Sequence, residues 1–174
     1  MKYLIDIILL ILLFIVVWQD FRERKISWLL LPLLFAVFVF ADIQKSNFGN
    51  IASSFTINSG FILIQLLLLS IYFSLRNKKF TNIINTYIGI GDILFFIVIC
   101  AAFSPVNFLL FYLLGLLLTI VGFLIYTSIM KRATAEIPLA GSMAALMMAF
   151  VLLKNVSGKI DFYSDATVTA WMGF

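Results

Sequence analysis

The sequence predicts an all-α membrane protein in which six transmembrane helices form one bundle. Of its 174 residues, 64% are hydrophobic and 11% are charged, whereas soluble domains are typically about 45–50% apolar and about 25% charged. The mean hydropathy is +1.15, and a water-soluble fold of this length could not bury so much apolar surface. Because the apolar segments follow one another closely, we expect residues 1–174 to form a single transmembrane domain.

Six apolar segments are candidates for membrane spans. A spanning helix needs about 20 mostly apolar residues, and fewer where the bilayer thins locally. The segments cover about residues 3–18, 26–41, 54–75, 89–103, 105–130 and 138–153. The first is interpreted as a helix rather than a cleaved signal peptide, because no small-residue cleavage site follows it. The tail beyond the sixth, which ends in residues 171–174, is too polar for a seventh span.

Local signals support the predicted helix starts. Ser27 is a candidate N-cap of the second helix. Ser104 and Pro105 have the order expected for the N-cap and first residue of the fifth helix. Pro138 marks the start of the sixth helix, because the residue before a proline disfavours α geometry. The fourth and fifth helices are separated by so few residues that they must form an antiparallel hairpin.

Basic residues predict the orientation of the bundle. Eight of the twelve Lys and Arg residues follow the first, third and fifth helices: Arg22, Arg24, Lys25, Arg76, Lys78, Lys79, Lys131 and Arg132. These loops alternate along the chain, so they lie on one side, which the positive-inside rule assigns to the cytoplasm. We therefore expect a multi-pass protein of the cell inner (cytoplasmic) membrane with both termini on the outer side.

The composition excludes several kinds of chemistry. The chain has no histidine and one cysteine, Cys100, so a disulfide within the chain, a His-based triad and a His/Cys zinc site are excluded. We expect no metal and no cofactor. No basic aromatic groove or basic tail indicates nucleic acid. Acid–base chemistry must then use carboxylates, Lys, Tyr or water.

Two of the eight acidic residues fall at the same predicted depth. Asp20 ends the first helix and Asp92 opens the fourth, and both ends are predicted to lie at the cytoplasmic boundary. An ionisable group beside hydrocarbon is costly and is a candidate functional residue. By contrast, Asp6 is interpreted as an interface residue. Three others are expected to be solvated in outer loops or the tail: Asp42, Asp161 and Asp165.

A close pair of carboxylates is suited to hydrolysis without metal, histidine or covalent intermediate. The two groups cannot both ionise easily, so one keeps a proton while the other acts as general base on water. Gly89 and Gly91 precede Asp92 and would allow the backbone to bend sharply and approach a substrate closely. Asp92 could instead simply cap its own helix.

These residues resemble a known family. Gly89-Ile90-Gly91-Asp92 is similar to the GxGD motif of intramembrane aspartyl proteases. Asp20 followed by Arg24-Lys25-Ile26 resembles the first aspartate motif of the type IV prepilin peptidases, and Ile137-Pro138 resembles a looser feature of that family. The resemblance extends over nearly the whole chain, although only the two aspartate motifs are specific.

The resemblance implies an aspartic endopeptidase that removes the basic leader of prepilins or pilin-like proteins at the cytoplasmic membrane face. Asp20 and Asp92 would be the catalytic pair. Supporting positions would be Gly89, Gly91, Lys25, Ile26 and Pro138. Long members of the family carry paired cysteine motifs and methylate the new N-terminus. This chain resembles the short, peptidase-only members, similar to preflagellin peptidases, so we expect no methyltransferase activity.

The sequence departs from the family pattern at two places. Ser27-Trp28 stands where Pro-Asn is common, and Leu94 stands where a lysine often follows the GxGD aspartate. Two alternatives stay open. A proton-coupled transporter would use the same acidic residues, although transporter sites usually lie near the midplane between repeated halves. The other alternative is a catalytically inactive member, which would have the same fold but no peptidase activity.

Overall fold

The computed structural model describes residues 2–44, 47–80, 82–84, 86–130, 137–157 and 161–165. Over these residues the chain is all-helical, with one isolated β-bridge between Ile84 and Ile88. The helices are α1 (Lys2–Glu23), α2 (Leu30–Ile43), α3 (Phe48–Asn77), α4 (Ile90–Cys100), α5 (Pro105–Met130) and α6 (Leu139–Ser157). Six helices in the predicted order are therefore confirmed. Lys131, Arg132 and residues 171–174 lie outside the described residues.

Four of the six helices are long and apolar enough to cross a membrane. These are α1, α3, α5 and α6. In contrast, α2 has 14 residues and α4 has 11. At 1.5 Å per residue α4 is about 16 Å long, roughly half the thickness of the hydrocarbon core. By length and composition the chain is thus a membrane protein with four candidate spans and two shorter apolar helices.

The predicted start of α2 is wrong by four residues. The helix begins at Leu30, and its N-cap, Leu29, makes no side-chain capping bond. Ser27 therefore does not cap it. Instead, the backbone N–H of Ser27 donates to Gln19 Oε1 at 2.9 Å, and its carbonyl accepts from the Leu30 N–H at 3.0 Å. Arg24, with a left-handed φ of 55°, ends α1 and starts this tight connection.

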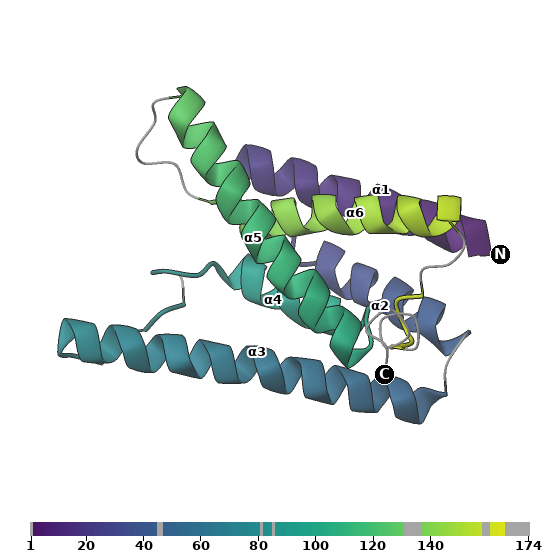
Figure 1. Cartoon of the computed structure of the whole chain (residues 1–174), viewed down its shortest axis with the longest axis horizontal. Helices are drawn as coiled ribbons and strands as arrows, with labels where there is room; N and C mark the ends of the chain where they lie inside the picture. Colours follow the sequence, from purple (N-terminus) through teal and green to yellow (C-terminus); the bar gives the residue numbers. More distant parts are fainter. Residues whose placement is uncertain are drawn as a thin grey trace.

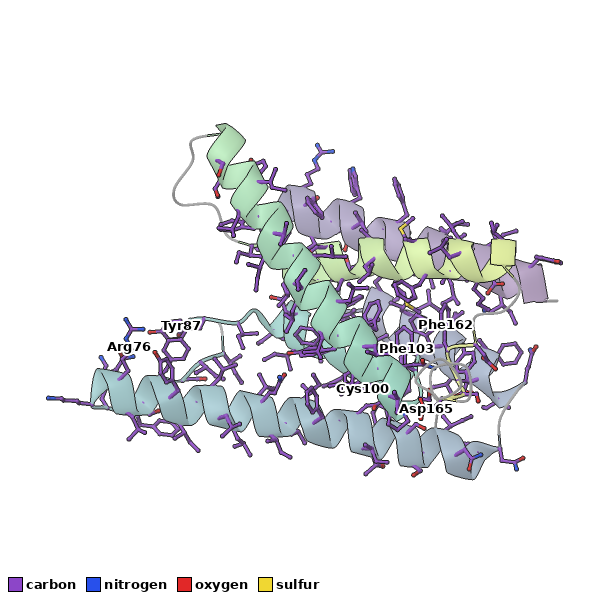
Figure 2. All side chains as sticks on the ribbon, in the orientation of Figure 1. Arg76, Tyr87, Cys100, Phe103, Phe162 and Asp165 are labelled. Carbon is purple, nitrogen blue, oxygen red and sulfur yellow. The ribbon has the colours of Figure 1, made fainter. Side chains whose placement is uncertain are left out.

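The helices gather around α4 (Figure 1). There α1 and α6 lie side by side, α3 lies on the opposite side of the molecule, α2 and α4 lie between them, and α5 crosses the others. The C-terminal ends of α1, α3 and α5 point to the same end of the bundle, away from the label N. We call this the basic end, because Arg22 and Arg24 lie at the end of α1 and Arg76 lies at the end of α3, where Figure 2 labels it.

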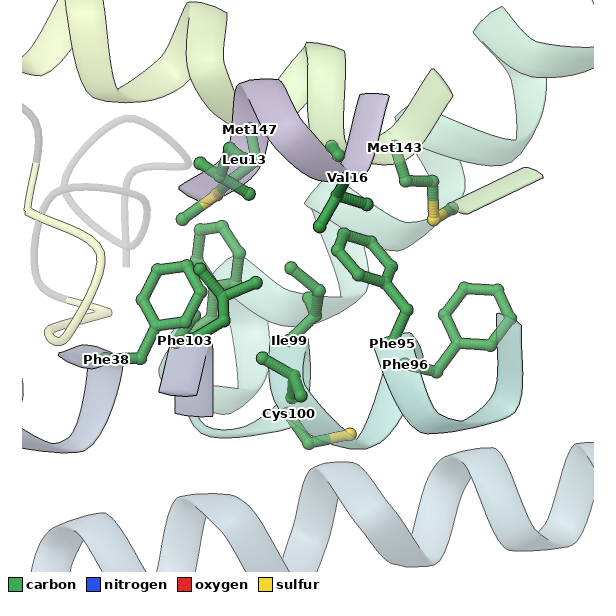
Figure 3. Close-up of a cluster of buried hydrophobic side chains, with 14 of the residues drawn as sticks. Leu13, Val16, Phe38, Phe95, Phe96, Ile99, Cys100, Phe103, Met143 and Met147 are labelled. Atoms are coloured by element: carbon green, nitrogen blue, oxygen red, sulfur yellow. The ribbon is translucent and has the colours of Figure 1, made fainter. Parts of the chain in front are cut away.

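Side chains of the neighbouring helices enclose α4 in the hydrophobic core. Figure 3 shows Phe95 and Ile99 of α4 among side chains of α1, α2 and α6. The fully buried side chains of this cluster include Leu13, Val16, Phe38, Phe95, Ile99, Met143 and Met147. Such close packing holds side chains in single arrangements. The N-terminus of α4, which carries Asp92, is therefore held at a defined place inside the bundle.

Buried polar side chains join the helix ends. Asn58 of α3 is 1% exposed and donates to the Cys100 and Phe103 carbonyls at 3.0 and 2.9 Å. It thereby satisfies carbonyls that the end of α4 leaves without helical partners. At the start of α5, Asp165 Oδ1 accepts from the backbone N–H groups of Val106 and Asn107 at 3.2 and 3.3 Å.

Several acidic residues differ from their predicted roles. Asp6 is 3% exposed and forms a buried ion pair with Lys154, with 3.1 Å between Oδ1 and Nζ, so it is not an interface residue. Asp42 is also buried rather than solvated. Asp165 caps α5, and Asp161 is half-buried. Buried charges need partners, and contacts between segments distant in sequence supply the partners of Asp6 and Asp165.

Candidate active site

Three helix ends meet at the candidate site. Asp20 lies one turn before the end of α1 and is 6% exposed. Asp92 lies in the first turn of α4 and is half-buried. The third element is the N-terminus of α6, which begins at Leu139 directly after Pro138.

The two carboxylates accept hydrogen bonds from consecutive backbone amides of α6. The Ala140 N–H donates to Asp92 Oδ1 at 3.0 Å, and the Gly141 N–H donates to Asp20 Oδ2 at 2.6 Å. The first N–H groups of a helix have no helical acceptor, and the helix dipole favours negative charge there. Side chains 72 positions apart in sequence are thus brought together by the start of a third helix.

Electrostatic contacts tie this pair to its surroundings. The charges of Asp20 and Asp92 act on one another, and the guanidinium of Arg24 acts on Asp20. The Gly89 backbone amide also bonds to the Asp92 carboxylate. Since Gly89 is the N-cap of α4, Asp92 closes its own helix in the manner of a capping box while also reaching α6.

The candidate site lies beside the middle of α5. Thr119, in the middle of α5, donates to Ser142 Oγ at 2.9 Å, so the start of α6 lies beside the middle of α5. Beyond Thr119 the helix continues to Met130, which is about 16 Å further at 1.5 Å per residue. The two carboxylates therefore lie deeper in the bundle than the end of α5.

The two glycines of the GxGD sequence differ in the space around them. Gly89 has φ −67° and ψ 144°, an extended conformation that any residue adopts, so the chain leaves helical geometry directly before α4 without a left-handed glycine. A Cβ at Gly89 would lie 3.2 Å from Asp92 Oδ2. A Cβ at Gly91 would meet Ile26 at 3.5 Å, which is ordinary contact. Gly89 therefore makes room for the Asp92 carboxylate, whereas a side chain at Gly91 would fit against Ile26.

The other residues named by the resemblance lie close by but have different surroundings. Ile26 contacts the first turn of α4, as above. The carbonyl of Pro138 accepts from the backbone N–H of Ser142 at 3.0 Å and from its Oγ at 2.6 Å, which stabilises the start of α6. Lys25 is exposed, and no hydrogen bond or ion pair joins it to Asp20 or Asp92. Leu94 is 39% exposed.

Gly141 is a site residue that the sequence did not indicate. A Cβ there would lie 2.8 Å from Asp20 Oδ2, 2.9 Å from the ring of Phe21 and 3.0 Å from Asp20 Cβ. Only glycine therefore allows α1 to approach α6 closely enough for the 2.6 Å bond. The sequence feature that could have indicated this close approach is the run of small residues Ala140-Gly141-Ser142, directly after the predicted start of α6.

The donor set offers acid–base chemistry. Two carboxylates are held by adjacent backbone amides, and within the described ranges no group of three or more His, Cys, Asp or Glu residues could hold a metal ion. A carboxylate pair of this kind can share a proton and act on a bound water.

Comparisons with protein-family models, with curated proteins and with solved structures gave no match to this chain.

Proposed function

We propose that the chain is a membrane-embedded aspartic endopeptidase in which Asp20 and Asp92 form the catalytic pair. The observation that carries this proposal is that both carboxylates bond to the adjacent amides of Ala140 and Gly141. Two acidic side chains close together in a largely apolar bundle carry an energetic cost, and groups of this kind gather at functional sites.

The proposed reaction uses the pair as base and acid. The ionised carboxylate takes a proton from a water molecule, whose oxygen attacks the carbonyl carbon of the scissile peptide bond. The protonated partner donates to the carbonyl oxygen as the tetrahedral intermediate forms. When the C–N bond breaks, the protonated carboxyl group donates a proton to the leaving amine while the other carboxylate takes a proton from a hydroxyl of the intermediate, so the pair again shares one proton. No metal and no covalent intermediate takes part.

The proposed substrate is the junction between a basic leader and an apolar helix in a prepilin or pilin-like protein. Support comes from the resemblance of the two aspartate motifs and from the position of the pair at the end of α1 and the start of α4. An apolar substrate helix can approach the pair from the bilayer. We also propose that the protein lies in the inner membrane with its basic end facing the cytoplasm. In this arrangement the shorter helices α2 and α4 also lie within the membrane.

One observation favours a non-catalytic alternative. Asp92 completes the cap of α4, and both aspartates cap α6, so the two residues already have a structural role. In that case the chain would keep the fold of the family without its activity. The alternative of a proton-coupled transporter predicts proton uptake into liposomes, which the peptidase does not.

Leader cleavage during co-expression with a candidate prepilin tests the proposal. Asparagine keeps the oxygen that accepts from the α6 amide but cannot act as base or acid. Asp20→Asn and Asp92→Asn should therefore accumulate to the wild-type level and lose cleavage at least about 100-fold. Asp161→Asn, a matched change at a half-buried aspartate outside the site, should cleave normally. A wild-type protein that leaves every tested prepilin intact would favour the non-catalytic alternative.

A further inference from the structure

A cavity of about 360 Å³ lies between α1, α5 and α6, next to the start of α6. This volume is within the range of about 300–1,000 Å³ that is typical of small-molecule sites. Phe21, Pro138 and Ser142 line it, but neither Asp20 nor Asp92 does. The cavity is therefore distinct from the carboxylate pair, although it lies at a similar depth.

One wall of the cavity is apolar and open to the surroundings. It is formed by Phe21, Leu118 and Phe123, with Gly122 between the last two. Phe21 is 53% exposed and Leu118 is 45% exposed, so in a membrane this wall faces the acyl chains. A Cβ at Gly122 would meet nothing within 4 Å. The missing side chain leaves a hollow beside α5 that an elongated apolar group can enter.

The polar side of the cavity carries a positive charge. Arg24 lines it directly after the end of α1. The residue has a left-handed φ of 55°, and its backbone N–H donates to the Asp20 carbonyl at 3.2 Å. Its side chain is exposed, and although its charge acts on Asp20, the ion pair within 4 Å found among the described residues joins Lys154 to Asp6 instead. The guanidinium is thus available to an anionic group at the basic end.

Tyr126 adds a hydroxyl and an aromatic ring to the cavity, one turn of α5 beyond Gly122. Tyrosine is enriched where a membrane protein meets the headgroup region. The charged and phenolic groups of the cavity therefore lie toward the basic end, and the deeper polar residues, Thr119 and Ser142, bond to one another beside the apolar wall. An apolar wall with a charged group at one end suits a phospholipid, which has an acyl chain, glycerol and phosphate in that order.

We propose that this cavity binds an anionic phospholipid, with its phosphate on Arg24 and one acyl chain beside Gly122. Basic pockets between transmembrane helices on the cytoplasmic side bind anionic headgroups, and guanidinium matches phosphate geometry well. A basic leader peptide would be repelled by Arg24, so the charge favours a lipid over that peptide. The lipid would contact α1, α5 and α6 together and hold Pro138 and the start of α6 in place.

Native mass spectrometry of the purified full chain tests the proposal, with phosphatidylglycerol and phosphatidylcholine as probes at equal concentration. Wild-type protein should retain phosphatidylglycerol at least about fivefold over phosphatidylcholine. Arg24→Gln should bring that ratio close to one, whereas Arg76→Gln, which removes a charge from α3, should not. Gly122→Leu should reduce phosphatidylglycerol retention at least about fivefold by filling the hollow. Its matched control is Gly60→Leu, since the space around Gly60 is also open but lies on α3.

Three outcomes would overturn the proposal. The first is equal retention of the two lipids by the wild type, and the second is equal retention by Gly122→Leu and Gly60→Leu. The third is displacement of the lipid by inorganic phosphate or by a synthetic leader–helix peptide, which would assign the cavity to a free anion or to a peptide. Lipid retention does not require cleavage, so the result is independent of whether the carboxylate pair is catalytic.

Discussion

Gly141 determines how closely α1 approaches the start of α6. We predict that Gly141→Ala separates Asp20 from its amide donor, because the new Cβ would lie 2.8 Å from Asp20 Oδ2 and 3.0 Å from Asp20 Cβ. Loss of a hydrogen bond to a charged group costs about 1.5–3 kcal/mol. Cleavage of a prepilin peptide should therefore fall by about 10- to 100-fold, measured as the initial rate with purified protein.

A matched glycine separates this effect from a general effect of alanine in a helix. Gly60 lies within α3 with open space around its Cβ position, and alanine is a better helix former than glycine. Gly60→Ala should therefore cleave at the wild-type rate. Wild-type cleavage by Gly141→Ala would contradict the role assigned to the close approach.

The contrast between Asp92 and Gly141 shows what sequence can predict at the scale of a residue. Asp92 was predictable because two glycines and a long apolar run mark its position within a few neighbouring residues. Gly141 was not, because its requirement arises from Asp20, 121 positions away. Similarly, Asp6 could not be identified as an ion-pair partner without knowing that α1 lies beside α6.

At the scale of elements, α6 is attached to α1 at two places. At the start of α6, the Gly141 N–H donates to Asp20 of α1. Near the other end of α6, Lys154 forms an ion pair with Asp6 of α1. Lys154 also lies 5.4 Å from the ring centroid of Phe162. The pair side chains are 7% and 5% exposed, so each charge depends on the other for its compensation.

We predict that Lys154→Met destabilises the protein by about 3–5 kcal/mol, because it leaves the Asp6 carboxylate buried without its cation. The double variant Asp6→Leu/Lys154→Met removes both charges and should recover most of that loss. Thermal unfolding in detergent, run as a double-mutant cycle, measures the difference. If the losses of the two single variants simply add, the ion pair does not couple the two helices.

The elements also show why helix boundaries were only partly predictable. The start of α5 at Pro105 agreed with its sequence signal, since proline restricts the local backbone directly. Both ends of α4 have hydrogen-bond partners on other helices. At its start, Asp92 accepts from the Ala140 N–H of α6, and at its end, the Cys100 carbonyl accepts from Asn58 of α3. We predict that Asn58→Leu costs about 1–3 kcal/mol in thermal unfolding, because the buried carbonyls of Cys100 and Phe103 lose their donor. An unchanged melting temperature would contradict this assignment.

For the whole molecule, composition and the positions of the apolar segments were sufficient to predict six helices in the correct order. Their arrangement around α4 was not predictable, because apolar helices in a membrane can pack in many ways and the choice depends on side-chain fit. The C-terminal ends of α1, α3 and α5 point to the same end of the bundle (Figure 1). This arrangement agrees with a positively charged end but does not by itself give the side of the membrane.

We predict that the basic end faces the cytoplasm. Phe80, which follows α3 at that end, is 90% exposed, and Phe48, at the opposite end of α3, is 72% exposed. In intact cells an impermeant maleimide should label Phe48→Cys, and it should label Phe80→Cys only after the membrane is opened. Cys100 is fully buried and serves as the unlabelled background. The reverse pattern would place the carboxylate pair near the outer face and contradict the proposed route to a cytoplasmic leader.

The most direct test of the central claim is the cleavage rate of a purified prepilin by four proteins: wild type, Asp20→Asn, Asp92→Asn and the double variant. Residues that act as one catalytic unit give losses that do not multiply. We expect each single variant to lose about 100- to 10,000-fold and the double variant to be no slower than the slower single variant. Cleavage that persists in either single variant, or losses that multiply in the double variant, would contradict a shared catalytic role.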